Sequence, residues 1–250
     1  MNISLEQLLE AGSHFGHQVR RWNPKMAPYI YAQHDGVHVF DLTKTKAGLE
    51  EACEAVKKAV SEGQVILFVA TKRQAKDIVT QAALSVGMPF VATRWLGGML
   101  TNFDQIKRSL RKLQDLKKSR DAGEFNEYTK HERLLLDREI ASLERMLGGV
   151  ASLTKTPDML FVLDTHEEAT AVREANKIGI PVVGVVDTNG DPQIIDYPIP
   201  ANDDAVKSIT LLVNAITEAV KEGQKKNEIE TEKENKKKAK AEAKESNLVT

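Results

Sequence analysis

Four short segments of this chain are apolar at nearly every position, and they constrain its fold more than any other feature. They are VILFVAT (65–71), MPFVATR (88–94), DMLFVLD (158–164) and IPVVGVVD (180–187). A strand with one face in water alternates apolar and polar residues, whereas a strand covered on both faces does not. Amphipathic helical patterns over 72–87 and 166–179 separate the members of each pair. This alternation predicts a doubly wound α/β fold around a mainly parallel sheet.

The same fold extends on both sides of these units. A helical pattern over 46–62 precedes the first unit. A long helical pattern over 203–223 closes the fold, with Asn202 or Asp203 as its N-cap. We therefore assign residues 1–103 and 151–224 to one globular α/β domain.

The segment 104–150 interrupts the alternation. Leucine and isoleucine recur at steps of three and four residues, first over 104–120 and again over 129–147. A turn signal separates the two stripes, and Thr129 with Glu132 forms a capping-box pattern at the start of the second. Two such stripes predict an inserted antiparallel α-helical hairpin, an arm that projects from the sheet domain.

The last segment, 225–250, is highly charged and has almost no large apolar residues. Such a segment cannot bury enough surface to order itself. We expect a disordered, solvated tail that can be helical in part.

Charge and cysteine content bear on partners and compartment. The formal net charge is −1, but residues 1–120 sum to +7 and residues 121–224 to −10. This asymmetry fits one face for a polyanion, although ordinary scatter explains it equally well. The single cysteine, Cys53, excludes an intrachain disulfide, and no apolar run is long enough for a membrane span. We expect a cytoplasmic protein with no membrane partner and no obligate homo-oligomer.

Cations and aromatic residues are interleaved in the first part of the chain. HQVRRWNPKMAPYIY (17–31) mixes three cations with a tryptophan and two tyrosines, and its prolines keep it out of a helix. Cations hold phosphates without regard to sequence, and aromatic rings stack on exposed bases. The candidate RNA-binding residues are Arg20, Arg21, Trp22, Lys25, Lys44, Lys72, Arg73, Lys76, Arg94, Trp95, Lys107, Arg108 and Arg111. The alternative is that both tryptophans lie in the core and the cations are simply solvated.

An enzyme that acts on a phosphorylated metabolite is the alternative function. The glycine-rich fingerprints of nucleotide enzymes, GxGxxG and GxxxxGK[ST], are absent. Thr71 can instead cap the helix after the first strand, with Lys72 and Arg73 reinforcing an anion site at its N-terminus. Asp164 and Asp187 follow strands, where catalytic acids often lie, but turns and helix caps use the same residues. We favour the capping interpretation.

Two histidines suggest a metal site. His14 and His17 share a face if their segment is helical, and Asp187 and Asp204 approach them at the carboxyl edge of the sheet. Isolated histidines are more often hydrogen-bonded packing residues. We therefore expect no cofactor, with a structural metal ion at His17, Asp187 and Asp204 as the alternative.

The chain resembles the bacterial small-ribosomal-subunit protein two family in eight separate blocks between about residues 4 and 223. In chain order these blocks are AGSHFGHQVRRWNPKMAPYIY, VHVFDLTKT, FVATKRQAK, RWLGGMLTNF, LGGV, PDMLFVLDTHEE, EANKIGIPVVGVVDTNGDP and PIPANDDAVKSI. Eight blocks in the family's order are far more specific than any single motif.

This resemblance implies a three-layer α/β domain with a protruding helical hairpin, bound to small-subunit ribosomal RNA between the head and the body of the subunit. It also implies a structural, non-enzymatic protein that is associated with the ribosome. Its further implied role is to help dock small-subunit protein one beside its other protein neighbours, which supports translation initiation.

The block RWLGGMLTNF (94–103) joins the second strand to the hairpin. We expect Gly97 and Gly98 to permit tight backbone geometry at this junction. The apolar residues after them are expected to anchor the base of the arm, while Arg94 faces RNA; these anchors are Met99, Leu100 and Phe103.

Overall fold

A five-stranded parallel sheet forms the centre of the molecule, for which the computed structural model describes the backbone of residues 3–246 and the side chains of residues 3–229. Its strands are β4 (Ile66–Val69), β5 (Phe90–Val91), β6 (Met159–Leu163), β7 (Val182–Val186) and β8 (Tyr197–Pro200). They lie in the order β5-β4-β6-β7-β8, and all pairs are parallel. The predicted parallel sheet is confirmed. The strand order reverses between β4 and β6, which places a topological switch point there.

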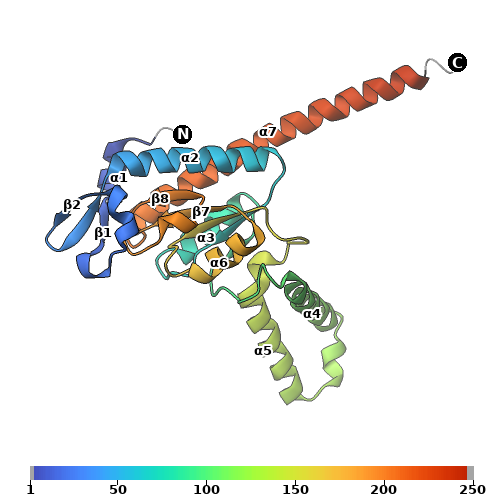
Figure 1. The fold of residues 1–250 in the computed structure, drawn as a ribbon. Helices are drawn as coiled ribbons and strands as arrows, with labels where there is room; N and C mark the ends of the chain where they lie inside the picture. Colours follow the sequence, from blue (N-terminus) through green and yellow to red (C-terminus); the bar gives the residue numbers. More distant parts are fainter. Residues whose placement is uncertain (1–2, 247–250) are drawn as a thin grey trace.

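Helices cover both faces of this sheet, which explains why its central strands are apolar throughout. One face packs against α2 (Leu42–Ser61), α3 (Lys76–Ser85) and α7 (Val206–Ser246), as Figure 1 shows. The short α1 (Leu5–Glu10) adds Leu8 to the same core. The other face packs against α6 (Ala169–Ile178) and the base of the hairpin. The three-layer arrangement is therefore confirmed.

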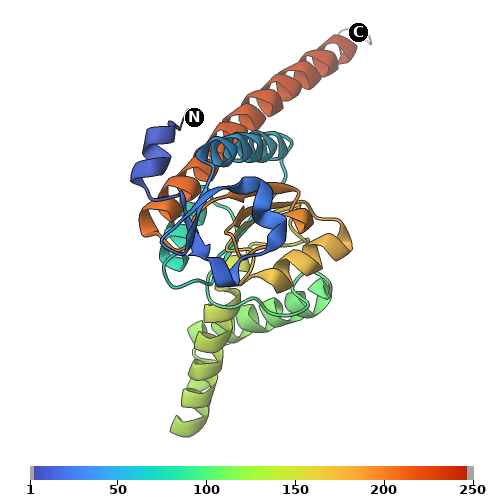
Figure 2. The same cartoon turned by 60° about the vertical axis from the view of Figure 1, so that its left-hand side comes forward.

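A second, antiparallel sheet lies near the N-terminus, and Figure 2 brings it to the front. Its strands are β1 (Phe15–Gln18), β2 (Ile30–His34) and β3 (Val37–Phe40), in the order β1-β3-β2. Between β1 and β2 the chain forms two short 3-10 helices, η1 (Val19–Arg21) and η2 (Pro24–Tyr29). Prolines thus exclude an α-helix from 17–31, as expected. The sheet itself was absent from our sequence prediction.

The inserted hairpin is confirmed. It consists of α4 (Phe103–Asp121), η3 (Glu124–Glu127), α5 (Lys130–Leu147) and η4 (Gly148–Val150). The capping box predicted at Thr129 and Glu132 is present. Leu113, Phe125 and Ile140 form a small core between the arms, while the hairpin projects away from the sheet.

The last helix begins three residues later than the sequence predicted. α7 begins at Val206, and Asn202 Oδ1 accepts from the N–H groups of Asp204 and Ala205 just before it. A short η5 (Pro192–Ile194) leads into β8. The tail predicted over 225–250 begins within α7, whose backbone is helical through Ser246. Side chains from residue 230 onward, and all of residues 247–250, lie outside the described residues, so the disorder of this tail stays a prediction.

Candidate nucleic-acid interface and acidic cluster

Most of the candidate RNA-binding cations are exposed, and apart from Lys25 in η2 and Lys44 in α2 they occupy three places. Arg20 and Arg21 lie in η1, after β1. A second group follows the carboxyl ends of β4 and β5, and a third lies on α4. The exposed cations are Arg20, Arg21, Lys25, Lys44, Arg73, Lys76, Arg94, Arg108 and Arg111.

These cations differ in whether the protein itself neutralises them. Lys25 Nζ lies 2.6 Å from Asp191 Oδ2, and Lys44 Nζ lies 3.8 Å from Asp41 Oδ2. The remaining exposed cations form no ion pair with any described residue. We call this set the open cations: Arg20, Arg21, Arg73, Lys76, Arg94, Arg108 and Arg111.

Two further candidates are partly screened by neighbouring rings. Trp22 is half-buried, and its ring centroid lies 5.0 Å from that of His38. Lys107 is half-exposed, and its Nζ lies 5.1 Å from the centre of the Phe103 ring. Each of these side chains therefore keeps only part of its surface for a partner.

Lys72, unlike the open cations, has its partners inside the protein. Its Nζ lies 2.7 Å from carboxylate oxygens of both Asp203 and Asp204, and 3.1 Å from Asp164 Oδ2. Burial alone lowers the pKa of Lys72, but the neighbouring carboxylates, Asp203 first, outweigh burial and raise it. Lys72 is therefore a charged internal partner, and a phosphate would have to displace three carboxylates to reach it.

The cap that we predicted at Thr71 for the helix after β4 is wrong. α3 begins at Lys76 with Ala75 at its N-cap, so Thr71 does not cap it. The Thr71 N–H instead donates to Glu168 Oε1 at 2.9 Å. Carboxylates already occupy this amide and Lys72, and they would repel a phosphate.

Glu174 on α6 organises the junction between β5 and the hairpin. Its Oε1 accepts from Trp95 Nε1 at 3.2 Å and from Gly98 N at 2.7 Å. Its Oε2 accepts from Leu100 N, Thr101 N and Thr101 Oγ1, each at 3.1 Å. Burial raises the pKa of Glu174, but these hydrogen bonds outweigh burial and leave the pKa below its ordinary value. The Trp95 ring is thus held in the core, as the structural alternative predicted.

The role of Glu174 was missed, although the sequence held a signal for it. Glu174 shares a helical face with Ala171, Ala175 and Ile178, which form the apolar side of this helix. A carboxylate on the buried face of a helix needs internal hydrogen-bond partners, because an unpaired buried charge is costly. The pattern predicts a buried acceptor without identifying its donors.

The two glycines of the junction are not equivalent. Gly98 has a φ of +85°, where an L-amino acid is strained. A Cβ on Gly97 would meet no atom within 4 Å. Our prediction of tight backbone geometry therefore applies to Gly98 alone. The anchoring role of Met99, Leu100 and Phe103 is confirmed, since all three are buried in one core cluster.

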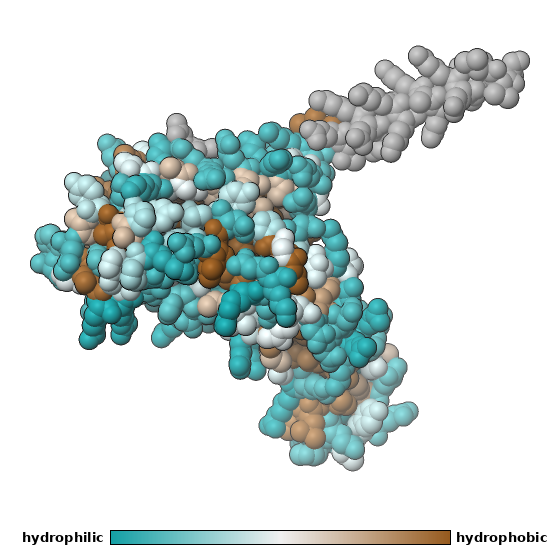
Figure 3. All heavy atoms as spheres, in the orientation of Figure 1, coloured by the Kyte–Doolittle hydropathy of each residue, from teal (hydrophilic) through white to brown (hydrophobic). Residues whose placement is uncertain are grey.

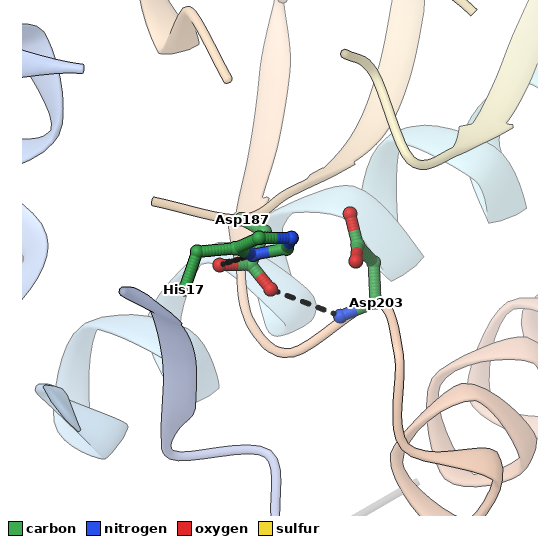
Figure 4. Close-up of side chains that lie close together, drawn as sticks. All are labelled: His17, Asp187 and Asp203. Carbon is green, nitrogen blue, oxygen red and sulfur yellow. Dashed lines mark hydrogen bonds and ion pairs between the residues drawn. The ribbon is translucent and has the colours of Figure 1, made fainter. Parts of the chain in front are cut away.

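An acidic cluster lies at the carboxyl edge of the sheet and takes in one histidine. His17 Nδ1 lies 3.0 Å from Asp187 Oδ1, and His17 Nε2 lies 3.5 Å from Asp204 Oδ2. His17, Asp187 and Asp203 each offer a ligand atom within 4.8 Å of the others, as Figure 4 shows. The predicted pairing of His17 with Asp187 and Asp204 is thus present, and Asp203 joins it. The sequence indicated Asp203 only as a helix cap.

The cluster alters the protonation of its members. Burial raises the pKa of Asp203, the negative charges of Asp187 and Asp164 raise it further, and Lys72 offsets part of the effect. The hydrogen bond with Asp187 raises the pKa of His17, while burial opposes it.

The expected helical face shared by His14 and His17 is wrong. His17 lies in strand β1, and His14 precedes that strand with its ring 4.0 Å from the ring of Phe15, measured between centroids. Only His17 therefore reaches the acids of the cluster.

The acids after β6 and β7 accept hydrogen bonds from turn amides, and neither of them caps an α-helix. Asp164 Oδ1 accepts from the N–H groups of His166 and Glu167, at 3.2 and 2.9 Å. Asp187 Oδ1 accepts from Thr188 N at 2.5 Å. Burial raises the pKa of the Cys53 thiol to about 11, which leaves that side chain a poor nucleophile. The hydrogen bonds of Asp164 and Asp187 and the raised pKa of Cys53 therefore do not fit the enzyme alternative.

The visible surface is mostly hydrophilic, with apolar patches on the body and on the hairpin (Figure 3). The exposed large hydrophobic residues of the hairpin are Tyr128, Leu134 and Leu135. Within the described residues, no helix combines the length and the apolar character needed to cross a membrane.

Known proteins resemble this chain over most of its length. The family profile described as Ribosomal protein S2 matches residues 8–223. Small ribosomal subunit protein uS2 of Parabacteroides distasonis is 51% identical over 218 residues, which cover 87% of this chain and 78% of that protein. The protein of the same name from Roseiflexus sp. is 51% identical over 217 residues, covering 87% and 83%. That of Cytophaga hutchinsonii is 50% identical over 219 residues, covering 88% and 86%.

Proposed function

Because this chain belongs to the ribosomal protein S2 family, and is therefore a structural, non-enzymatic constituent of the small ribosomal subunit, we propose that it binds the RNA of that subunit through its open cations. The enzyme alternative is not carried further. We also propose a cytoplasmic location on the ribosome, and docking of small-subunit protein one.

The observation that carries the RNA proposal is that the open cations have no carboxylate partner among the described residues. A cation that is already paired with a carboxylate gains little from a phosphate, because it must first lose its partner. Arg73, Lys76 and Arg94 follow the ends of two adjacent strands, while Arg108 and Arg111 lie on α4 of the hairpin. Unpaired guanidinium and ammonium groups can each hold a phosphate.

The proposed surface differs from the sequence prediction at several positions. We leave out Lys72 and Trp95, because their polar groups bind Asp203 and Glu174 inside the protein. Lys25 and Lys44 are weaker candidates because acidic side chains lie beside them. Trp22 and Lys107 remain candidates for contacts at the edge of this surface.

Two pairs of cations on one helix give a matched test. Arg108 and Arg111 on α4 have no ion-pair partner among the described residues, whereas Lys112 and Lys117 pair with Glu139 and Glu144 of α5. Small subunits that lack this protein are to be incubated with R108Q/R111Q or with K112Q/K117Q, and the bound fraction measured by co-sedimentation. We expect R108Q/R111Q to bind at least tenfold more weakly, and K112Q/K117Q to bind like the unaltered protein.

Equal binding by both double variants would contradict the role of the open cations. Glutamine is a good helix former, so neither double variant is expected to unfold the hairpin. Circular dichroism of each variant checks this assumption before the subunits are added.

The proposed docking of protein one rests on the family resemblance and on the acidic character of residues 121–224, whose net charge is −10. Small subunits without this chain are expected to lose protein one during sedimentation and to regain it when the chain is added back. Retention of protein one at the same level in both samples would exclude this role.

A further inference from the structure

The side of α5 that faces away from α4 is exposed. Leu136, Ile140 and Leu143 lie on the side toward α4 and pack in the small core of the hairpin. An α-helix turns about 100° per residue, so residues spaced by four, three and four positions can share one face on the opposite side. We call this face the outer face of α5; its residues, all exposed, are Leu134, Arg138, Ala141 and Arg145.

Apolar side chains distinguish α5 from α4. Leu134 is 46% exposed and Leu135 is 49% exposed, and Tyr128, just before the helix, is 48% exposed. Figure 3 shows apolar surface on the hairpin. Among the described residues, the exposed large hydrophobic side chains include none from α4. A phosphate backbone gains nothing from a leucine, whereas burial of a leucine against another protein stabilises a complex. The outer face of α5 therefore favours a protein partner.

The charge of this face selects an acidic partner. Arg138 and Arg145 belong to the outer face, and Lys130 lies one turn before it. None of these three cations forms an ion pair with a described residue. Asp137 brings one negative charge against these three positive ones. Electrostatic complementarity therefore favours a partner that presents carboxylates.

The spacing along the outer face fits a helix. Leu134 and Ala141 are seven residues apart, and so are Arg138 and Arg145. Seven residues is the period at which one helix packs along another, with apolar residues in the seam and charges at its sides. The short side chain of Ala141 also permits close approach of a second backbone.

We propose that an acidic amphipathic helix of a neighbouring protein in the small subunit docks on the outer face of α5. Its apolar stripe covers Leu134 and Ala141, and its carboxylates pair with the cations Lys130, Arg138 and Arg145. The hairpin and this helix then form a three-helix bundle. This proposal goes beyond the RNA contacts proposed for α4 and does not depend on them.

The test uses the full chain in the assembled subunit. The photocrosslinking amino acid p-benzoylphenylalanine replaces Leu134, which keeps an apolar side chain in the face. Small subunits that lack this protein are incubated with the modified chain, isolated again by sedimentation and irradiated. We expect one crosslinked protein. Mass spectrometry of the crosslinked peptide is expected to identify a segment with apolar residues at helical spacing and Asp or Glu between them.

Two arginines of α5 provide a matched control. Arg133 and Arg138 are both exposed and have no ion-pair partner among the described residues, but they lie about 140° apart around the helix. R138E is expected to reduce the crosslink yield at least fivefold, because it places a carboxylate opposite the carboxylates of the partner. R133E is expected to leave the yield unchanged. Sedimentation before irradiation shows that each chain has entered the subunit, so a lost crosslink does not result from weakened RNA binding.

The proposal is overturned if the position of Leu134 crosslinks to no protein in subunits that contain the modified chain. A crosslinked protein segment without acidic residues contradicts it as well, and so does an equal loss of yield in R133E and R138E. Crosslinking to RNA alone would assign the outer face to phosphate binding instead.

Discussion

The carboxylate of Glu174 accepts hydrogen bonds from three backbone amides, an indole and a hydroxyl. The donors lie in the segment between β5 and α4, while Glu174 itself lies on α6. One side chain therefore satisfies several amides that the turn leaves without backbone partners, and it does so with a charge, which strengthens each hydrogen bond.

Glu174→Gln is expected to lower the free energy of unfolding by about 3 kcal/mol, because the amide group turns a donor toward buried donors. Urea unfolding measures this loss. The control is Glu167→Gln, at an exposed position two residues before α6, which is expected to change stability by less than about 0.5 kcal/mol. Similar losses in the two variants would contradict the role given to Glu174.

The contribution of Glu174 is also expected to depend on pH. Burial raises the pKa of Glu174, yet its hydrogen bonds leave the pKa below the ordinary value of 4.5. A group with a lowered folded-state pKa contributes stability that is present above its unfolded pKa and is lost as pH falls through the folded one. The stability difference between the unaltered chain and Glu174→Gln should therefore shrink as the pH falls below about 4.5. Urea titrations at pH 7 and pH 3.5 check this, and a constant difference would contradict it.

At the scale of elements, the junction at Gly98 sets how the hairpin leaves the sheet. Its φ of +85° turns the chain just after Trp95 is fixed and just before Met99 and Leu100 enter the core. The base of the hairpin is also closed on its other side, because a Cβ on Gly149 would lie 2.3 Å from the Phe90 carbonyl oxygen. Both ends of the arm are therefore fixed by glycines.

Gly98→Ala is expected to destabilise the protein by about 1–2 kcal/mol, the cost of a left-handed backbone for a residue with a Cβ. Gly97→Ala, one position earlier, is expected to be nearly neutral, because a Cβ there meets open space. Thermal unfolding of both variants measures the contrast. Equal effects would mean that the turn at Gly98 does not constrain the arm.

Elements with a strong periodic pattern could be predicted from the sequence, and weakly patterned ones could not. β4, β6 and β7 are buried on both faces, and the hairpin helices carry regular apolar stripes, so burial leaves its mark in the residue types. β8 contains two prolines in four residues and sits at the sheet edge, where proline is tolerated, so its sequence is typical of a loop. Strand β2 is almost wholly exposed and carries no apolar alternation.

The candidate site could also be predicted only in part from the sequence, but for a different reason. Candidate cations follow from residue type alone, but whether a cation is open or paired depends on residues far away in the chain. Lys72 meets Asp203, 131 positions later, and Trp95 meets Glu174, 79 positions later. No local pattern encodes such pairs.

At the scale of the whole molecule, the open cations extend from the body onto the hairpin, so RNA affinity is expected to fall steeply with salt. Each phosphate contact contributes about 0.7–0.9 to the slope of log affinity against log salt. Arg108→Gln with Arg111→Gln is expected to reduce that slope by about 1.5, measured by filter binding of the isolated protein to small-subunit RNA. An unchanged slope would show that these residues do not contact phosphate.

The packing of α2 also has a consequence for synthesis. Its apolar face packs against β8 and α7, and Thr45 donates to the Pro200 carbonyl oxygen at 2.5 Å. These partners are translated about 150 residues later, which takes roughly ten to thirty seconds at bacterial elongation rates. The nascent chain therefore exposes the apolar face of α2 during most of its synthesis. Its core can be completed only near the end of translation. We expect a chaperone at the ribosomal exit tunnel to cover this apolar face until its partners have been translated.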